Sequence, residues 1–247
     1  MSERGVSNTI GFVFVFSLII LVASVVSVSG FGVLRDVRDA ERINNAERAF
    51  DVLADNIGDI QSESAPSRST EIKLADASVG TADATEITVT IAGTDYPTDG
   101  TPIRTEPIVY SAENTRIIYE AGAVIRQEES GAVMVRNPPL LATPQRTALQ
   151  FVRLESPSGS GGRAGTTTIL VQAVQTDSQV HAVERGTDIP VTIEVKTAPE
   201  RAAAWSRYFE EEIGSDVCST SGGTVTCSYD TDVAILSTTT VDVKISG

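Results

Sequence analysis

The sequence predicts an α+β protein: a long N-terminal helix, then a mainly antiparallel, sandwich-like β head with one short helix packed on it. An uncharged apolar run at residues 6–34 is followed, from Val33 to Ile60, by apolar positions at a helical period, whereas later apolar runs alternate at every second residue. About 180 residues of short strands divided by turn formers are typical of one sandwich-like domain rather than two.

Residues 6–34 carry no charged side chain and form the predicted transmembrane helix. A membrane span needs about 20 apolar residues at a rise of 1.5 Å each, whereas the apolar part of a secretory signal has about 7–15. Small residues such as Ser24, Ser27 and Gly30 lie in its second half, where they let helix backbones approach closely. A cleaved secretory signal is disfavoured, and an ordinary uncut anchor remains an alternative.

Residues 35–60 are expected to continue the span as an amphipathic helix. Charged residues separate apolar positions three or four residues apart: Val37, Ala40, Ile43, Ala46, Phe50, Leu53, Ile57 and Ile60. An unbroken helix from Val6 to Ile57 would be roughly 78 Å long. A separate helix that caps the head predicts the same pattern, so the period leaves both arrangements open.

The segment 61–70 is polar, rich in serine and contains Pro66, so it is predicted to be a linker. The head then covers residues 71–247. Alternating or β-branched runs predict strands in it at 86–91, 117–119, 132–135, 148–152, 168–171, 190–196 and 240–245.

One helix is expected in the head, between Thr197 and Gly214. Thr197 and Glu200 have the spacing of a capping box, Pro199 falls in the first turn, and Gly214 can supply a left-handed C-cap. The apolar face of this helix consists of Trp205, Phe209 and Ile213. Trp205 is therefore predicted to anchor the helix on the sheet rather than to bind a ligand.

Cys218 and Cys227 are placed symmetrically about Gly222-Gly223, a dipeptide suited to a two-residue hairpin turn. Counting back from that turn puts both cysteines in a non-hydrogen-bonded pair, with Cα atoms about 4.5 Å apart. A cross-strand disulfide is predicted, and it favours an extracytoplasmic head. A two-ligand metal site is the alternative, but there is no second cysteine pair and His181 is the only histidine.

The charge balance disfavours nucleic acid as a partner. The formal net charge is −14, and no basic stripe interrupts the acidic surface. Only three basic residues are lysines: Lys73, Lys196 and Lys244. This acidic, lysine-poor composition resembles that of haloarchaeal proteins, whose self-repulsion is screened by multimolar salt.

The sequence predicts no catalytic residue, no cofactor and no metal site, and therefore a protein that is not an enzyme. It contains no nucleophile elbow, Walker loop or zinc-protease motif. The Gly- and Ser-rich segment 157–165 indicates a flexible loop rather than a phosphate cradle. The paired acids Glu128-Glu129 and Glu211-Glu212 are expected to be solvated surface, and a structural role is expected for His181.

The N-terminal residues Arg4-Gly5-Val6-Ser7-Asn8-Thr9-Ile10-Gly11 resemble those of archaeal type IV pilin-like proteins, in particular those of haloarchaea. The resemblance covers about the first 35 residues and implies a charged leader at residues 1–5. It also implies cleavage by a prepilin peptidase between Gly5 and Val6, with Arg4, Gly5 and Val6 as the processing residues. Ile10 stands where bacterial pilins carry glutamate.

These observations predict a membrane-anchored, non-catalytic cell-envelope protein resembling a minor pilin or pseudopilin. Its partners would be the lipid bilayer, a prepilin peptidase and other pilin-like subunits, and no nucleic acid. A single-pass topology with a cytoplasmic N-terminus and an extracytoplasmic head is expected. The alternative is an uncut anchor that displays a ligand- or partner-binding sandwich, and cleavage at Gly5-Val6 distinguishes the two.

Overall fold

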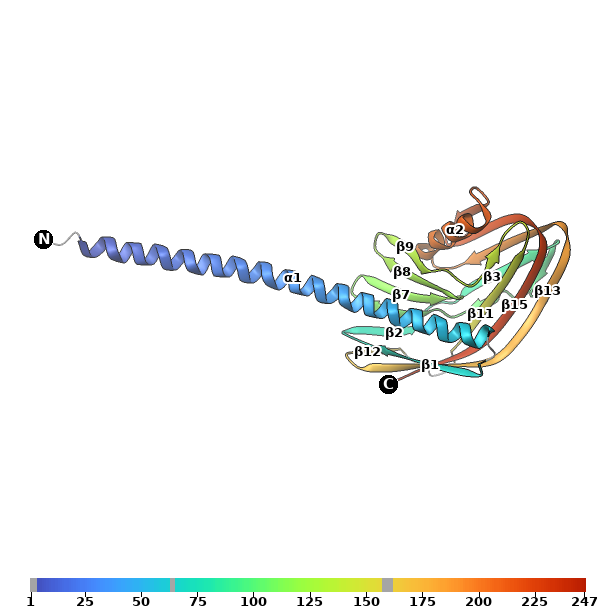
Figure 1. The fold of residues 1–247 in the computed structure, drawn as a ribbon, viewed down its shortest axis with the longest axis horizontal. Helices are drawn as coiled ribbons and strands as arrows, with labels where there is room; N and C mark the ends of the chain where they lie inside the picture. Colours follow the sequence, from blue (N-terminus) through green and yellow to red (C-terminus); the bar gives the residue numbers. More distant parts are fainter. Residues whose placement is uncertain (1–3, 63–64, 157–161) are drawn as a thin grey trace. The chain divides into compact units, whose positions relative to one another are not determined.

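The structure is a computed structural model that describes residues 4–62, 65–156 and 162–247 (Figure 1). It has the predicted α+β architecture, with a long N-terminal helix, two mainly antiparallel sheets and a short helix in the head. The chain divides into two compact units, Met1–Asn44 and Asn45–Gly247. The helices are α1 (Arg4–Ser62) and α2 (Pro199–Ile213).

Helix α1 is continuous for 59 residues, so the amphipathic segment is a direct extension of the apolar one. Its stretch Ile10–Ser27 is long and apolar enough to cross a membrane, and none of that stretch is buried in the protein. Exposed Phe, Leu, Ile and Val side chains on every side of a helix are typical of a surface that meets lipid rather than water. The first unit is thus a helix suited to a bilayer.

The head contains two sheets. In the larger sheet the strand order is β10 (Leu141–Ala142), β11 (Thr147–Glu155), β15 (Thr224–Ser246), β13 (Thr168–Lys196), β3 (Thr85–Ile91) and β4 (Thr94–Tyr96), with β1 (Ser67–Lys73) on β13, β14 (Cys218–Ser221) on β15 and β5 (Ile103–Thr105) on β3. In the smaller sheet it is β12 (Arg163–Gly165), β2 (Ala77–Thr81), β6 (Ile108–Ala112), β7 (Thr115–Glu120), β8 (Ala123–Glu128) and β9 (Gly131–Arg136). The pairs are antiparallel except β11 with β15, which is parallel.

Strands β13 and β15 are far longer than the sequence predicts and pair with each other along most of their length. Only the ends of β13, at 168–171 and 190–196, show a strand pattern in the sequence. Its middle is mostly exposed, so no buried alternation marks it, and the ladder to β15 holds it extended. Three register shifts occur there, at Gln175/Asp177, Val180/Ala182 and Arg185/Ile189.

The part of α1 from residue 45 onward belongs to the core of the head. Six of its apolar side chains are buried: Ala46, Phe50, Leu53, Ala54, Ile57 and Ile60. The Phe50 ring meets Tyr110 of β6 edge-on, with 6.5 Å between ring centroids. Asn56 Nδ2 donates to Thr70 Oγ1 of β1 at 2.8 Å. The helix therefore contacts both sheets.

The predicted linker at 61–70 is too long at both ends. Helix α1 continues to Ser62 and β1 begins at Ser67, while residues 63–64 lie outside the described part. Gln61 Nε2 donates to the Gln150 carbonyl of β11 at 2.8 Å, which ties the last turn of the helix to the larger sheet. The polar, Ser-rich composition did not indicate where the helix ends or the strand begins, because hydrogen bonds to distant residues order both flanks.

Substitution of Phe50 by alanine is expected to lower the free energy of unfolding by about 3–5 kcal/mol, because the ring is fully buried between helix and sheet. The measurement is denaturant unfolding of the full chain in detergent. Val52 lies on the same helix but is 51% exposed, so Val52→Ala should change stability by less than about 0.5 kcal/mol. Equal effects of the two variants would contradict the packing described here.

Helix α2 begins differently from the prediction. Its N-cap is Ala198, which makes no side-chain capping bond, so the predicted capping box of Thr197 and Glu200 is wrong. Pro199 does occupy the first turn. Gly214 has φ 134° and ψ 163° instead of the left-handed helical values expected of it. The Thr197 hydroxyl is used elsewhere, in a buried cluster with a carboxylate.

Trp205 has the predicted anchoring role. Its side chain is fully buried, and its ring stacks on Phe209 with 5.8 Å between centroids. Tyr208 meets the Trp205 ring edge-on at 6.2 Å. These rings fill the space between α2 and the two sheets.

Candidate functional site

A buried polar cluster joins the start of α2 to the end of β7. The Glu120 carboxylate is inaccessible to solvent and forms an ion pair with Arg201 Nε through Oε2. Its Oε1 accepts hydrogen bonds from Thr197 Oγ1 at 2.8 Å and from Trp205 Nε1 at 2.9 Å. Glu120, Thr197, Arg201 and Trp205 are called the Glu120 cluster below.

The Glu120 cluster satisfies a charge that would otherwise be costly to bury. Arg201 Nε also donates to Thr197 Oγ1 at 3.1 Å, and Thr85 Oγ1 bonds the same hydroxyl at 3.2 Å. These contacts use Nε, and among the described residues the two terminal nitrogens of Arg201 make no hydrogen bond. The carboxylate thus fixes the position of a guanidinium group.

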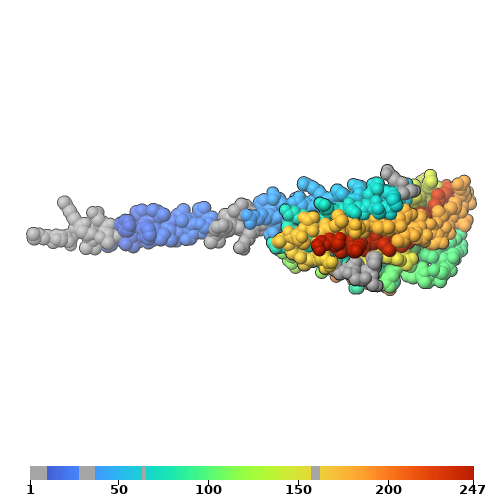
Figure 2. All heavy atoms as spheres, turned by 90° about the horizontal axis from the view of Figure 1, so that it is seen from below, coloured from blue at the N-terminus to red at the C-terminus, as the bar shows by residue number. Residues whose placement is uncertain are grey.

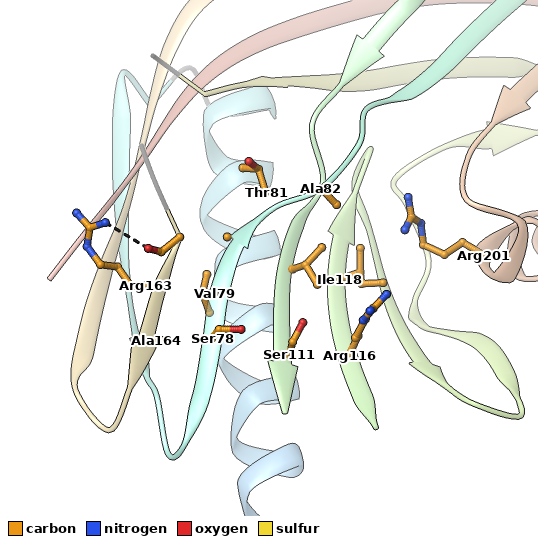
Figure 3. A pocket seen from close by; sticks show the side chains of 13 residues that line it. Ser78, Val79, Thr81, Ala82, Ser111, Arg116, Ile118, Arg163, Ala164 and Arg201 are labelled. Carbon is orange, nitrogen blue, oxygen red and sulfur yellow. Dashed lines mark hydrogen bonds between the residues drawn. The ribbon is translucent and has the colours of Figure 1, made fainter. Parts of the chain in front are cut away.

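A cavity of about 380 Å³ lies beside the Glu120 cluster, on the face of the smaller sheet that does not contact α1 (Figure 3). Ser78 of β2, Ser111 of β6 and Arg116 of β7 are register partners in neighbouring strands and form one row of its floor. The next row, Gly80, Val109 and Ile118, is formed by residues without polar side chains. The floor is therefore partly hydroxylic and partly apolar.

The charges around this cavity are positive. Arg116 and Arg201 border it on one side and Arg163 of β12 on the other (Figure 3). Within the described residues that line it, there is no aspartate or glutamate. A chain whose net charge is −14 thus has a hollow lined by arginine and serine. Such a lining suits an anion and offers neither a nucleophile with a base nor a metal ligand set.

A family model described as "Family of unknown function (DUF7289)" matches residues 4–245. The chain belongs to this family. The match includes both α1 and the head, so the helix with the apolar stretch and the β sheets are parts of one family architecture. No curated protein and no solved structure matches the chain.

In this DUF7289 protein the predicted processing residues lie in the first unit. The backbone of Arg4, Gly5 and Val6 forms the first turn of α1. Residues 1–3 of the predicted leader lie outside the described residues, as do the side chains of Arg4 and Val6. The processing prediction therefore stays a prediction.

The two cysteines form the expected disulfide. Cys218 and Cys227 are register partners of β14 and β15, joined through the Gly222-Gly223 turn. Both turn glycines have positive φ, 57° and 96°, as a two-residue turn of this kind requires. A Cβ on Gly223 would also lie 2.6 Å from the Thr197 carbonyl, so the turn packs closely on the start of α2.

Among the described residues of the remaining sequence candidates, only the segment 157–165 contributes to the cavity, through Gly162, Arg163 and Ala164. His181 Nε2 lies 2.8 Å from Thr238 Oγ1, and partial burial lowers the pKa of His181. Glu128 accepts a hydrogen bond from Arg126 Nε at 2.8 Å at the surface. The predicted loop 157–165 is a loop only in part, because Arg163–Gly165 form β12 beside the cavity, while residues 157–161 lie outside the described part.

The DUF7289 structure brings together three residues that the sequence does not single out: Glu120, Arg116 and Arg201. One signal was present, since Glu120 ends the apolar run Ile117-Ile118-Tyr119. A carboxylate that directly follows buried residues of the same strand is itself expected to be buried, and a buried carboxylate needs a partner. Its partner lies on a helix distant in sequence, so the pairing follows from the fold alone. No group of metal-ligating side chains occurs among the described residues.

Proposed function

We propose that this protein is a membrane-anchored, non-catalytic component of the cell envelope, resembling an archaeal type IV pilin-like subunit. The observation that supports this proposal best is α1 itself, because one unbroken helix is apolar and exposed at one end and part of the head core at the other. A plain anchor needs only hydrophobicity. In a pilin-like subunit the apolar part of such a helix would pack among the helices of neighbouring subunits.

In this proposal the head lies outside the cell and the N-terminus in the cytoplasm. The Cys218–Cys227 disulfide favours an oxidising compartment for the head. Arg4 precedes the apolar stretch, in agreement with the positive-inside rule. The lipid bilayer, a prepilin peptidase and other pilin-like subunits are the proposed partners.

A second candidate function is supported by the cavity beside the Glu120 cluster. An uncut single-pass anchor that displays a binding domain would use this hollow rather than α1 as its functional part. Both candidates share the membrane anchor and differ in whether Gly5-Val6 is cleaved.

The N-terminus of the mature protein is the measurement that separates the two candidates. We expect chains from native membranes to begin at Val6 when a prepilin peptidase is present and at Met1 or Ser2 when it is deleted, by intact mass and N-terminal sequencing. Gly5→Leu is expected to block cleavage. Gly58→Leu is the matched control, since Gly58 lies in the same helix outside the resembling segment and a Cβ there meets no atom within 4 Å. An uncut start in both strains would refute the pilin-like proposal and favour the uncut anchor.

A further inference from the structure

We propose that the cavity beside the Glu120 cluster binds a small polar molecule through one oxyanion group, a phosphate, sulfate or carboxylate, held between Arg116 and Arg201. This proposal is independent of cleavage at Gly5-Val6, because the cavity lies entirely within the second unit. Three features support it: a preorganised arginine, a second arginine without a counter-ion, and a floor with room for a ligand.

Arg201 is the preorganised group. Its side chain is only 6% exposed, and Glu120 and Thr197 hold its Nε. In the described part of the chain, its terminal nitrogens donate no hydrogen bond, and the residue borders the cavity. A guanidinium group fixed by a buried carboxylate loses little side-chain entropy when it binds an oxyanion with its free edge.

Arg116 supplies the second charge. It is exposed on β7, on the same strand face as Ile118 and Glu120. Its side chain makes neither a hydrogen bond nor an ion pair with any of the described residues. Figure 3 shows Arg116 and Arg201 on the same side of the cavity, one from the sheet and one from α2. Arg201 is already paired with Glu120, so the charge of Arg116 is the one that a bound oxyanion would balance, while Arg201 would add charge-assisted hydrogen bonds.

Carboxylates near this pair belong to neighbouring hollows rather than to the cavity. Asp83 and Glu86 border a hollow shared with Arg116 and Arg201, but Glu86 is already paired with Lys196 Nζ at 3.1 Å. A third hollow at Arg116 is lined by Glu113, Glu128, Glu129 and Glu200. These acids form no ion pair with Arg116 among the described contacts, so they shape the field around the site without occupying it.

The floor sets the size and nature of the ligand. Gly80 packs closely on the neighbouring strand edge, because a Cβ there would lie 3.3 Å from Gly162 Cα. The volume of about 380 Å³ falls at the lower end of the range of roughly 300–1,000 Å³ for small-molecule pockets. The backbone of Arg163 on β12 is three strands from β7, roughly 14 Å at the usual spacing, so Arg163 lies at the opposite side of the cavity from the proposed oxyanion position (Figure 3). The ligand body then lies over the hydroxyls of Ser111 and Ser78.

Equilibrium dialysis of the full chain in detergent against radiolabelled inorganic phosphate tests the site, at constant ionic strength because sodium chloride screens surface charge. We expect saturable binding of one phosphate per chain. Arg116→Gln should weaken it about tenfold or more, because a charge-assisted pair of bonds is lost. Arg146→Gln is the matched control, since Arg146 is exposed, lies outside the cavity lining and should leave binding unchanged.

Trp205 gives a second readout that is specific to this location. It is the single tryptophan of the chain, and its indole nitrogen bonds the carboxylate that holds Arg201. Oxyanion binding at Arg201 should shift the fluorescence emission of Trp205. The midpoint of that shift should fall at the same anion concentration as half-saturation in the dialysis experiment. Sulfate and glucuronate are then tested as competitors of phosphate, to show whether the site prefers a tetrahedral dianion or a carboxylate. Saturable binding of either competitor supports the site. The proposal is overturned if none of the three anions binds saturably, or if Arg116→Gln binds as the unsubstituted chain does.

Discussion

Arg201→Met is expected to lower the free energy of unfolding by about 3–5 kcal/mol. The variant keeps a long side chain at this position of α2 but leaves the Glu120 carboxylate buried without its cation. Two neutral donors, the Thr197 hydroxyl and the Trp205 indole, remain on that carboxylate and cannot neutralise it. The measurement is denaturant unfolding of the full chain in detergent, followed by Trp205 emission and by far-ultraviolet circular dichroism.

Two further variants identify the cause of that loss. The double variant Glu120→Leu with Arg201→Met removes both charges and is expected to recover most of the stability, because an apolar pair can replace a buried ion pair. Arg153→Met breaks a surface pair, in which Arg153 Nη2 lies 2.7 Å from Glu155 Oε1 and both side chains are 45% exposed. It should cost less than about 1 kcal/mol. If the single and double variants lost the same free energy of unfolding, the cause would be the changed side-chain volume rather than the unpaired charge.

Leu18→Arg combined with Val22→Arg is expected to abolish stable membrane insertion. Both positions lie one turn apart within Ile10–Ser27, and each arginine near the middle of a span costs about 2.5–3.5 kcal/mol. Together with the lost apolar side chains, this should move most of the protein out of the carbonate-resistant membrane fraction. The disulfide should fail as well, since a head retained in the cytoplasm keeps Cys218 and Cys227 reduced and open to alkylation.

The paired control for the span is Leu18→Phe with Val22→Leu, which preserves hydrophobicity at the same two positions. It should leave both carbonate resistance and the disulfide intact. Retention of the double-arginine variant in membranes would mean that α1 does not carry the protein into the bilayer, and the anchor assignment would have to be abandoned.

The features that the sequence predicted best are those determined by neighbouring residues. The Gly222-Gly223 turn alone fixes the register that brings Cys218 to Cys227, and the helical period reached residue 60 correctly. The period could not tell a lipid-facing stripe from a core-facing one. Only the fold shows that Phe50 is buried against Tyr110, whereas Phe12 and Phe16 are exposed.

The failures have a common physical cause, which is competition from partners far away in sequence. Thr197 has the local spacing of a capping residue. Its hydroxyl instead donates to the buried Glu120 carboxylate on β7 and does not cap the first turn of α2. The middle of β13 lacks alternation because the β15 ladder, rather than a buried face, makes it a strand. The arginine pair at the cavity joins residues from two elements, and no local pattern contains both.

The position of β15 has a consequence for the biosynthesis of the head. This strand is the last in the chain, yet in the larger sheet it lies between β11 and β13, two earlier strands (Figures 1 and 2). The same head is built around residues 45–62, which leave the ribosome long before it. The larger sheet can therefore be completed only when residues 224–246 arrive, whereas the smaller sheet contains no part of β15. Until then the edges of β11 and β13 that pair with β15 stay open, and such unpaired edges are prone to aggregation.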